Sequence, residues 1–314
     1  MFTRSIAAGI LLAAVSLATA ASAQTVRFGA GQQGSQNYGV NAALAQAIGT
    51  GTDLGVTVQA FGGPTAYLPL VNSGELDMAA VVTPDLGDAV RGSGPFQGLP
   101  HDELRVISPL LPSPVGLMVR ADSDIASIAD LKGKRVAWGI PAQASLQPYV
   151  EGALANGGLV AADVTQVPVS SVANGVAALV SGNVDATLFA LRGGAVVEAD
   201  SATGGIRWLP FDDSAEAVER MITVAPEAYI FDVAEGSGVV GATGAFKTMA
   251  YDYVLITRAG FDADAVGAVA ALIKEQTAQI AGSNDILRAM TSETIKRSYP
   301  SLPVHDAAKA VFAE

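Results

Sequence analysis

Apolar and polar residues follow two recurring patterns along this chain. Short apolar runs rich in Val, Ala and Phe predict buried strands, and longer stretches with an apolar residue every three or four positions predict amphipathic helices. Strand, helix, strand, helix and strand are predicted in this order at 25–31, 37–49, 56–61, 64–74 and 76–82. The same order returns at 134–140, 145–158, 164–170, 171–182 and 184–190. Alternation of this kind indicates parallel strands joined by right-handed crossovers.

The two patterns align without a gap when the second is shifted by 108 positions, the spacing between Arg27 and Arg135. Asp77 then falls on Asp185, and a Ser-Gly helix stop precedes both aspartates. Chance coincidence of common residues is the alternative to an internal repeat. The sequence therefore predicts two similar α/β units.

Two extended segments connect these units. Residues 104–125 are mostly apolar and contain three prolines, and residues 247–260 form a second extended run before a long amphipathic helix that Asp262 or Asp264 would cap. If the second segment returns to the first unit, the chain crosses twice and forms a hinge above a cleft. We therefore expect an α/β fold of two lobes, each a mainly parallel sheet flanked by helices. The expected boundaries are 24–117 for the first part of lobe 1, 118–245 for lobe 2 and 246–314 for the return to lobe 1.

The first 23 residues have the features of a secretory signal peptide. Arg4 precedes an apolar stretch, and Ala21-Ser22-Ala23 forms a small-residue cleavage site. A membrane anchor is the alternative, but the apolar run is shorter than the ~20 residues that a spanning helix needs. We expect a mature chain that is exported to the periplasm and does not insert into the membrane.

Composition narrows the classes of function. Apolar residues make up 50% of the 314 positions and charged residues 15%, which is enough apolar material for a packed core. The net charge of −12 and the lack of a basic run argue against nucleic-acid binding. There is no cysteine, and His101 and His305 are the two histidines, so neither a thiol nucleophile nor a typical zinc site is expected.

The loops after the predicted strands contain the candidate ligand-binding residues, because ligands of open parallel sheets bind beyond the carboxyl ends of the strands. These loops are rich in Gly, Ser, Thr and Gln, and several lie where a helix begins. Backbone N–H groups at helix starts favour an anion such as a carboxylate, although ordinary turn and capping chemistry explains any single residue. The candidates in these loops are Gln33, Gly34, Ser35, Gln36, Thr65, Thr83, Asp85, Gln143, Ala144, Ser145 and Arg192. Tyr38, in the helix after the first loop, joins them through the resemblance described below.

Arg192 is the candidate with a positively charged side chain. It follows an apolar strand at the point where a ligand would arrive, so it could hold a carboxylate through two hydrogen bonds. It could equally form a surface ion pair with Glu198. Both interpretations remain open at this stage.

Three motifs resemble the TAXI family, the extracytoplasmic solute receptors of TRAP transporters. They are the loop at 34–39, the Gly-Glu-Leu-Asp strand entry at 74–77 and the Asp-Leu-Lys-Gly-Lys-Arg-Val segment at 130–136. The resemblance implies a type II periplasmic-binding-protein fold, a receptor that closes on an amino acid, keto acid or dicarboxylate, and a TRAP membrane permease as partner. We expect a monomer and name no catalytic residue, cofactor or metal ligand, while the oligomeric state and any bound metal stay open at this stage. The loops at 63–65 and 142–145 and Arg192 depart from the family's usual residues, so the identity of the ligand is not implied.

Two other classes of protein remain open. A binding protein of an ABC importer would have the same lobes and a different permease, and an exported enzyme could use the same fold. The chain has no Gly-x-Ser-x-Gly elbow, and the paired carboxylates Asp122/Asp124 and Asp262/Asp264 are expected to cap helices rather than to bind calcium. We therefore predict a binding protein and not an enzyme.

Overall fold

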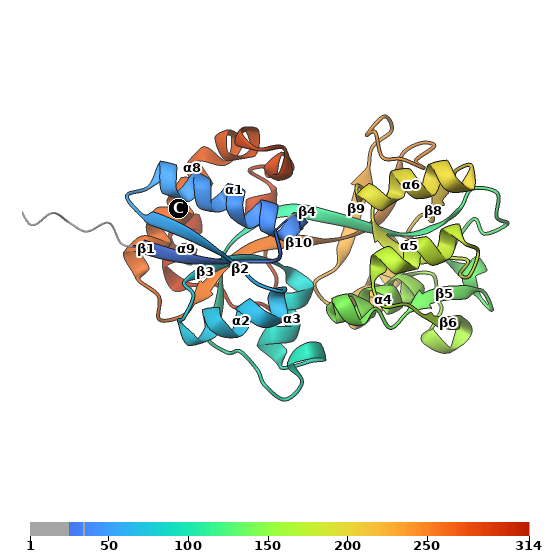
Figure 1. The fold of residues 1–314 in the computed structure, drawn as a ribbon, viewed down its shortest axis with the longest axis horizontal. Coiled ribbons are helices and arrows are strands. Elements are labelled where there is room, and N and C mark those ends of the chain that lie inside the picture. The colour runs from blue at the N-terminus through green and yellow to red at the C-terminus, as the bar shows by residue number, and fades with distance from the viewer. Residues whose placement is uncertain (1–24, 34, 314) are drawn as a thin grey trace, which may run out of the picture.

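The computed structural model describes residues 25–33 and 35–313. The strands are β1 (Thr25–Ala30), β2 (Gly55–Ala60), β3 (Met78–Val82), β4 (Leu104–Arg120), β5 (Arg135–Trp138), β6 (Thr165–Pro168), β7 (Thr187–Ala190), β8 (Ile206–Trp208), β9 (Tyr229–Val233) and β10 (Phe246–Arg258). The helices are α1 (Gln36–Gly51), α2 (Pro64–Ser73), α3 (Thr83–Arg91), α4 (Gln147–Asn156), α5 (Val172–Val180), α6 (Gly194–Thr203), α7 (Ala215–Val224), α8 (Ala263–Ser283) and α9 (Asp306–Ala313). Figure 1 shows two lobes joined by β4 and β10, with α1 and α8 on one side of the lobe 1 sheet and α2 and α3 on the other. The predicted signal peptide and Gly34 lie outside the described residues.

The predicted repeat is confirmed by the pairing of the strands. In each unit the first strand is parallel to the second and to the third, and the register is the same after the shift of 108 positions. The paired residues are Arg27–Thr57 and Phe28–Met78 in the first unit, and Arg135–Thr165 and Val136–Ala186 in the second. An identical register in both units is not expected from chance coincidence of common residues.

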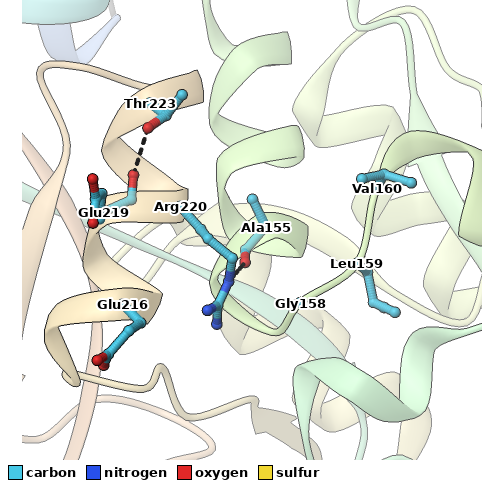
Figure 2. A pocket seen from close by; sticks show the side chains of 8 residues that line it. All are labelled: Ala155, Gly158, Leu159, Val160, Glu216, Glu219, Arg220 and Thr223. Carbon is cyan, nitrogen blue, oxygen red and sulfur yellow. Dashed lines mark hydrogen bonds between the residues drawn. The ribbon is translucent and has the colours of Figure 1, made fainter.

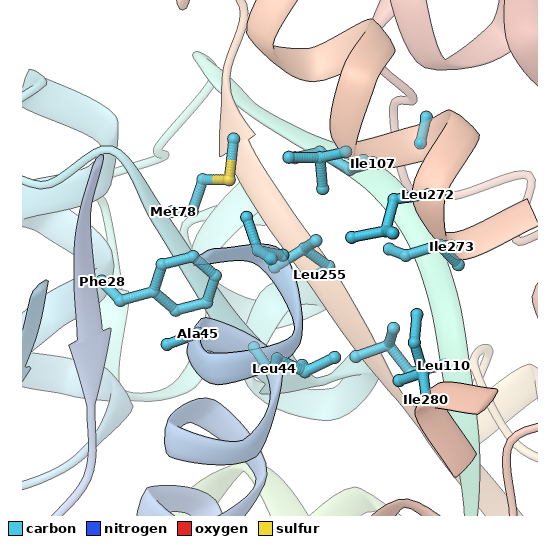
Figure 3. Close-up of a cluster of buried hydrophobic side chains, with 14 of the residues drawn as sticks. Phe28, Leu44, Ala45, Met78, Ile107, Leu110, Leu255, Leu272, Ile273 and Ile280 are labelled. Carbon is cyan, nitrogen blue, oxygen red and sulfur yellow. The ribbon is translucent and has the colours of Figure 1, made fainter. Parts of the chain in front are cut away.

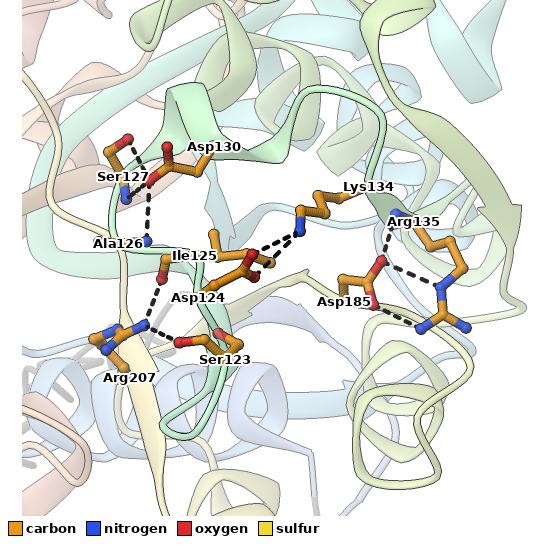
Figure 4. A network of polar contacts seen from close by, with 10 residues as sticks. All are labelled: Ser123, Asp124, Ile125, Ala126, Ser127, Asp130, Lys134, Arg135, Asp185 and Arg207. Carbon is orange, nitrogen blue, oxygen red and sulfur yellow. Dashed lines mark hydrogen bonds and ion pairs between the residues drawn. The ribbon is translucent and has the colours of Figure 1, made fainter.

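One ion pair recurs at the same place in both units. In the first unit the Arg27 Nε donates to Asp77 Oδ2 at 2.8 Å, and the backbone N–H of Arg27 donates to the same oxygen at 2.9 Å. In the second unit Arg135 makes the corresponding bonds to Asp185 at 3.2 and 2.8 Å (Figure 4). Each pair ties the start of the first strand to the entry of the third.

The two aspartates of this pair should differ in their contribution to stability. The Asp77 side chain is 7% exposed and the Asp185 side chain 26%. We expect Asp77→Ala to lower the free energy of unfolding by about 2 kcal/mol. The substitution removes the buried carboxylate that accepts the charge-assisted hydrogen bond of Arg27. Asp185→Ala should cost about 1 kcal/mol or less, as solvated pairs do. Urea denaturation of both variants tests this order, and equal losses would contradict it.

The hydrogen-bonded ladder continues from one lobe to the other, which differs from the prediction of a separate, mainly parallel sheet in each lobe. Its order is β2-β1-β3-β10-β4-β7, with β8 paired to β4 and β9 to β10. The reason is the length of the two hinge strands: β4 has 17 residues and β10 has 13, and they pair antiparallel through the crossing. Within each unit the predicted parallel strands are parallel, and β5 and β6 form a separate two-stranded sheet.

Separate apolar clusters form the cores of the two lobes. In lobe 1, Phe28 on β1 and Met78 on β3 pack with Leu44 on α1 and Ile273 on α8 (Figure 3). In lobe 2, another cluster includes Val136, Tyr149, Leu154, Leu188 and Met221. We keep the names lobe 1 and lobe 2 for the segments predicted above. The crossing strands contribute to both clusters, with Leu111 and Tyr253 in the lobe 1 cluster and Met249 and Tyr251 in the lobe 2 cluster.

The predicted helix caps are correct at one site and wrong at the other. Asp262 caps α8 by accepting from the Ala265 N–H at 2.8 Å. Asp122 instead pairs with Arg120. Asp124 pairs with Lys134, as Figure 4 shows. Among residues 25–33 and 35–313, no helix is long and apolar enough to cross a membrane. The same residues contain no group of His, Asp and Glu side chains arranged to hold a metal ion.

Candidate functional site

A cavity of about 750 Å³ lies between the lobes at the carboxyl ends of β1, β2, β3 and β5. Its lobe 1 side consists of the turns after the first three strands, and its lobe 2 side is the short 3₁₀ segment Pro141–Leu146. Tyr251 and Tyr253 of the hinge strand β10 also line it. Six predicted site residues line this cavity: Ser35, Thr65, Asp85, Gln143, Ala144 and Ser145. We call it the cleft cavity.

Other predicted site residues lie elsewhere. Thr83 is fully buried, and its hydroxyl accepts from the Asp252 N–H at 3.4 Å. Gln36 and Arg192 line a different cavity, described below. Gln33 is exposed and Tyr38 half-buried, and neither is among the residues that line the cleft cavity. The cleft geometry therefore brings together about half of the predicted set.

Two residue types in the cleft cavity were missed by the sequence analysis. Asn37 accepts from the Gly31 N–H at 2.7 Å and donates to the Tyr67 hydroxyl at 3.1 Å, so it fixes the turn after β1. Tyr251 and Tyr253 are both 6% exposed and are separated by one residue along β10. The sequence Tyr-Asp-Tyr in a predicted strand already placed both phenols on one face, because strand side chains alternate.

Asp85 is the one charged side chain among the described residues that line the cleft cavity. Its Oδ1 accepts a hydrogen bond from the Ser145 hydroxyl at 2.5 Å, which joins α3 of lobe 1 to lobe 2. Removal from water raises the pKa of Asp85 to about 6, while the hydrogen bond from Ser145 opposes this shift and the charge of Asp88 adds to it. Burial likewise raises the pKa of the Tyr251 and Tyr253 hydroxyls. The cavity thus contains one carboxyl group that ionises near neutral pH and two phenols that burial keeps protonated.

Prolines reduce the number of backbone donors at the helix starts around the cleft. Pro64 is the first residue of α2, Pro141 the first of the 3₁₀ segment and Pro84 the second of α3. Proline has no N–H, so these starts offer fewer amide donors than the sequence analysis assumed. At α1, the Ser35 hydroxyl already accepts from the Tyr38 N–H at 3.1 Å. An anionic ligand stays a prediction, and it would have to be held mainly by neutral donors in this cavity.

A second cavity of about 870 Å³ adjoins the same face of the hinge strands. It is lined by Leu111 and Ser113 of β4, which pair with Tyr253 and Tyr251 of the cleft cavity. Directly paired residues place their side chains on one face of a sheet. Arg192 lines this cavity and donates to the Ser237 carbonyl at 2.9 Å, whereas the sequence analysis had considered a pair with Glu198 or a ligand contact.

A third hollow, of about 520 Å³, lies on the surface of lobe 2 between α4 and α7 (Figure 2). Its lining includes Glu216, Glu219 and Arg220, and Arg220 donates to the Ala155 carbonyl at 2.9 Å. None of the predicted ligand loops contributes to it. The strand-end geometry that positions ligands in α/β folds is therefore found at the cleft and not here.

Comparisons with known proteins agree on the architecture. The sequence pattern of the NMT1-like family matches residues 28–314. A putative sulfonate ABC transporter protein, the periplasmic sulfonate-binding protein SsuA of Methylobacillus flagellatus, is 17% identical, with 90% of this chain and 79% of that chain covered and a TM-score of 0.55. A TctC solute-binding protein from Polaromonas is 17% identical, with 92% and 94% covered and a TM-score of 0.54. PhnD1 of Prochlorococcus marinus, solved with methylphosphonate, is 12% identical, with 87% and 95% covered and a TM-score of 0.54. At these identities the likeness shows the fold, which is the two-lobed fold of periplasmic binding proteins.

Proposed function

Because this chain belongs to the NMT1-like family, we propose that it is a solute-binding receptor that captures a small organic molecule and delivers it to a membrane permease. The observation that carries this proposal is the cleft cavity. It lies at the carboxyl ends of strands from both lobes, beside the two hinge strands, and a direct hydrogen bond from Ser145 to Asp85 spans it. Such a site can enclose a ligand from two sides.

Binding would proceed by hinge bending. The crossing strands β4 and β10 connect lobes with separate cores, so a small change in their backbone angles would move one set of loops relative to the other. A ligand drives this closure only as far as it binds the closed state better than the open state. Ser145 and Asp85 already form a hydrogen bond across the cleft, and a ligand in the cavity beside them would add contacts to both lobes.

The finer assignments follow from the sequence. The three motifs that resemble the TAXI family support a TRAP permease as partner, and the features of residues 1–23 support export to the periplasm. An ABC importer is the second candidate, because a structural neighbour is described as part of a putative sulfonate ABC transporter. For the ligand we keep the predicted class of amino acid, keto acid or dicarboxylate.

A thermal-shift screen of these three ligand classes tests the receptor function. A ligand present at 100 times its dissociation constant should raise the free energy of unfolding by about 2.7 kcal/mol, because it binds the folded state alone. Mass spectrometry of the solution after binding should recover the ligand unchanged. A chemically converted ligand would identify an enzyme instead. If no member of the three classes raises the melting temperature, the proposed ligand class is wrong.

A further inference from the structure

Asp85 has acceptor capacity that the protein does not use. Its described hydrogen bond, from Ser145, goes to Oδ1. No group of the described chain donates to Oδ2, and Asp85 lines the cleft cavity. An ionised carboxylate accepts hydrogen bonds and donates none. The cleft cavity therefore presents a free acceptor to any molecule that enters it.

The groups around Asp85 do not neutralise its charge. Tyr67, Tyr251, Tyr253 and Asp88 interact electrostatically with Asp85 in the described chain, and all four are acids. The cleft lining described above contains no Lys or Arg side chain. A ligand carboxylate placed next to Asp85 would meet like charge, whereas an ammonium group would meet its complement. Ser145 supplies a hydroxyl donor at the position that such a group would take.

We propose that Asp85 is the specificity-determining residue of the cleft and selects ligands that bring an amine nitrogen to its carboxylate. This inference rests on the proposed receptor function and narrows its ligand class. Among molecules that share one carbon skeleton, the amino acid binds more tightly than the keto acid or the dicarboxylate without an amine. The ligand nitrogen takes the place of the Ser145 hydroxyl, or shares the carboxylate with it through Oδ2.

Isothermal titration calorimetry at pH 8 with matched ligands tests the proposal. The probes are glutamate, 2-oxoglutarate and glutarate, which share one skeleton, and alanine and pyruvate, which share another. The amine members should bind at least about 10-fold more tightly, because a hydrogen bond to a charged group changes affinity by about 10- to 100-fold. Asp85→Asn should weaken the amine ligand by a similar factor and remove the preference.

Two further variants separate recognition from folding. Asp122→Asn makes the same chemical change at a carboxylate whose side chain is 66% exposed on the surface of lobe 2, and it should retain the preference. Ser145→Ala removes the donor that occupies Oδ1, so the amine ligand should bind at least as tightly as it does to the unmodified protein. Circular dichroism melts establish that each variant is folded before titration.

The outcomes distinguish this inference from the receptor function. Binding of both members of a pair with equal affinity, or a preference that survives Asp85→Asn, overturns the role of Asp85 and leaves the receptor function in place. If none of the five compounds binds to the unmodified protein, the proposed ligand class fails and this inference fails with it. Tighter binding of the amine members that is lost in Asp85→Asn supports both.

Discussion

Replacing Asp252 with alanine should lower the free energy of unfolding by about 3–5 kcal/mol, the range seen when one partner of a buried ion pair is removed. The Asp252 side chain is 0% exposed and lies on the hinge strand β10. It accepts from the Tyr229 hydroxyl at 2.6 Å, from Arg297 Nη1 at 2.7 Å and from the Tyr299 hydroxyl at 2.6 Å. Alanine would leave a guanidinium group and two phenols without their acceptor. Urea denaturation at pH 7 measures the loss.

Asp122→Ala is the matched control for this prediction. Asp122 pairs with Arg120 at 3.0 Å, but its side chain is 66% exposed, so the substitution should cost less than about 1 kcal/mol. Asp252→Asn should also destabilise the fold. The amide nitrogen of asparagine is itself a hydrogen-bond donor, and it would face groups that donate to the carboxylate in the unmodified protein. Similar losses for Asp122→Ala and Asp252→Ala would show that the buried network contributes no more than a surface pair.

The Asp252 network also positions the cleft. Asp252 lies between Tyr251 and Tyr253, and neighbouring strand residues point to opposite faces. The two tyrosines line the cleft cavity, while Asp252 contacts Arg297 and Tyr299 of the C-terminal segment on the other side. Tyr229, at the start of β9, joins this network from lobe 2. The C-terminal segment thereby fixes the strand whose opposite face lines the cleft cavity.

The repeat, the strand order within each unit and the two crossings could be predicted because they depend on local patterns. Apolar periodicity and glycine stops report burial and chain reversal within a few residues, so β1 to β3 and β5 to β7 were located closely. The continuous ladder could not be predicted in the same way. It depends on antiparallel pairing between β4 and β10, which are far apart in the sequence.

The candidate site was predicted less completely than the fold. Six residues of the predicted strand-end loops line the cleft cavity, but the direction of each side chain depends on distant neighbours. Thr83 is buried against the hinge strand, and Arg192 bonds to Ser237, 45 positions away. The sequence did contain one signal that was not used: Pro64, Pro84 and Pro141 lie at helix starts, where they remove N–H donors from the predicted anion site.

The stabilising effect of Asp85→Asn should depend on pH, rising to about 3 kcal/mol at pH 7. The pKa of Asp85 is raised from its ordinary value of 3.8 to about 6 in the folded protein, chiefly by burial. Between these values the folded chain keeps a proton that the unfolded chain has released, so the contribution of Asp85 to stability falls as pH rises through this window. Above about pH 6 the free-energy cost of the buried charge no longer changes with pH. Asparagine carries no charge and avoids that cost.

Urea denaturation of both proteins at intervals from pH 4 to pH 8 measures this difference, and subtraction cancels the titration of all other groups. The gain in Asp85→Asn should be about 0.6 kcal/mol at pH 4, grow between pH 4 and pH 6 and then level off. Ser145→Ala removes a hydrogen bond that lowers the pKa of Asp85, so in that background the rise should extend to higher pH. If the gain in the free energy of unfolding is independent of pH, or grows on acidification, the Asp85 carboxyl is not desolvated in the folded protein. A gain with the expected profile would mean that the cleft retains a destabilising charge, as expected of a group kept for ligand recognition rather than for folding.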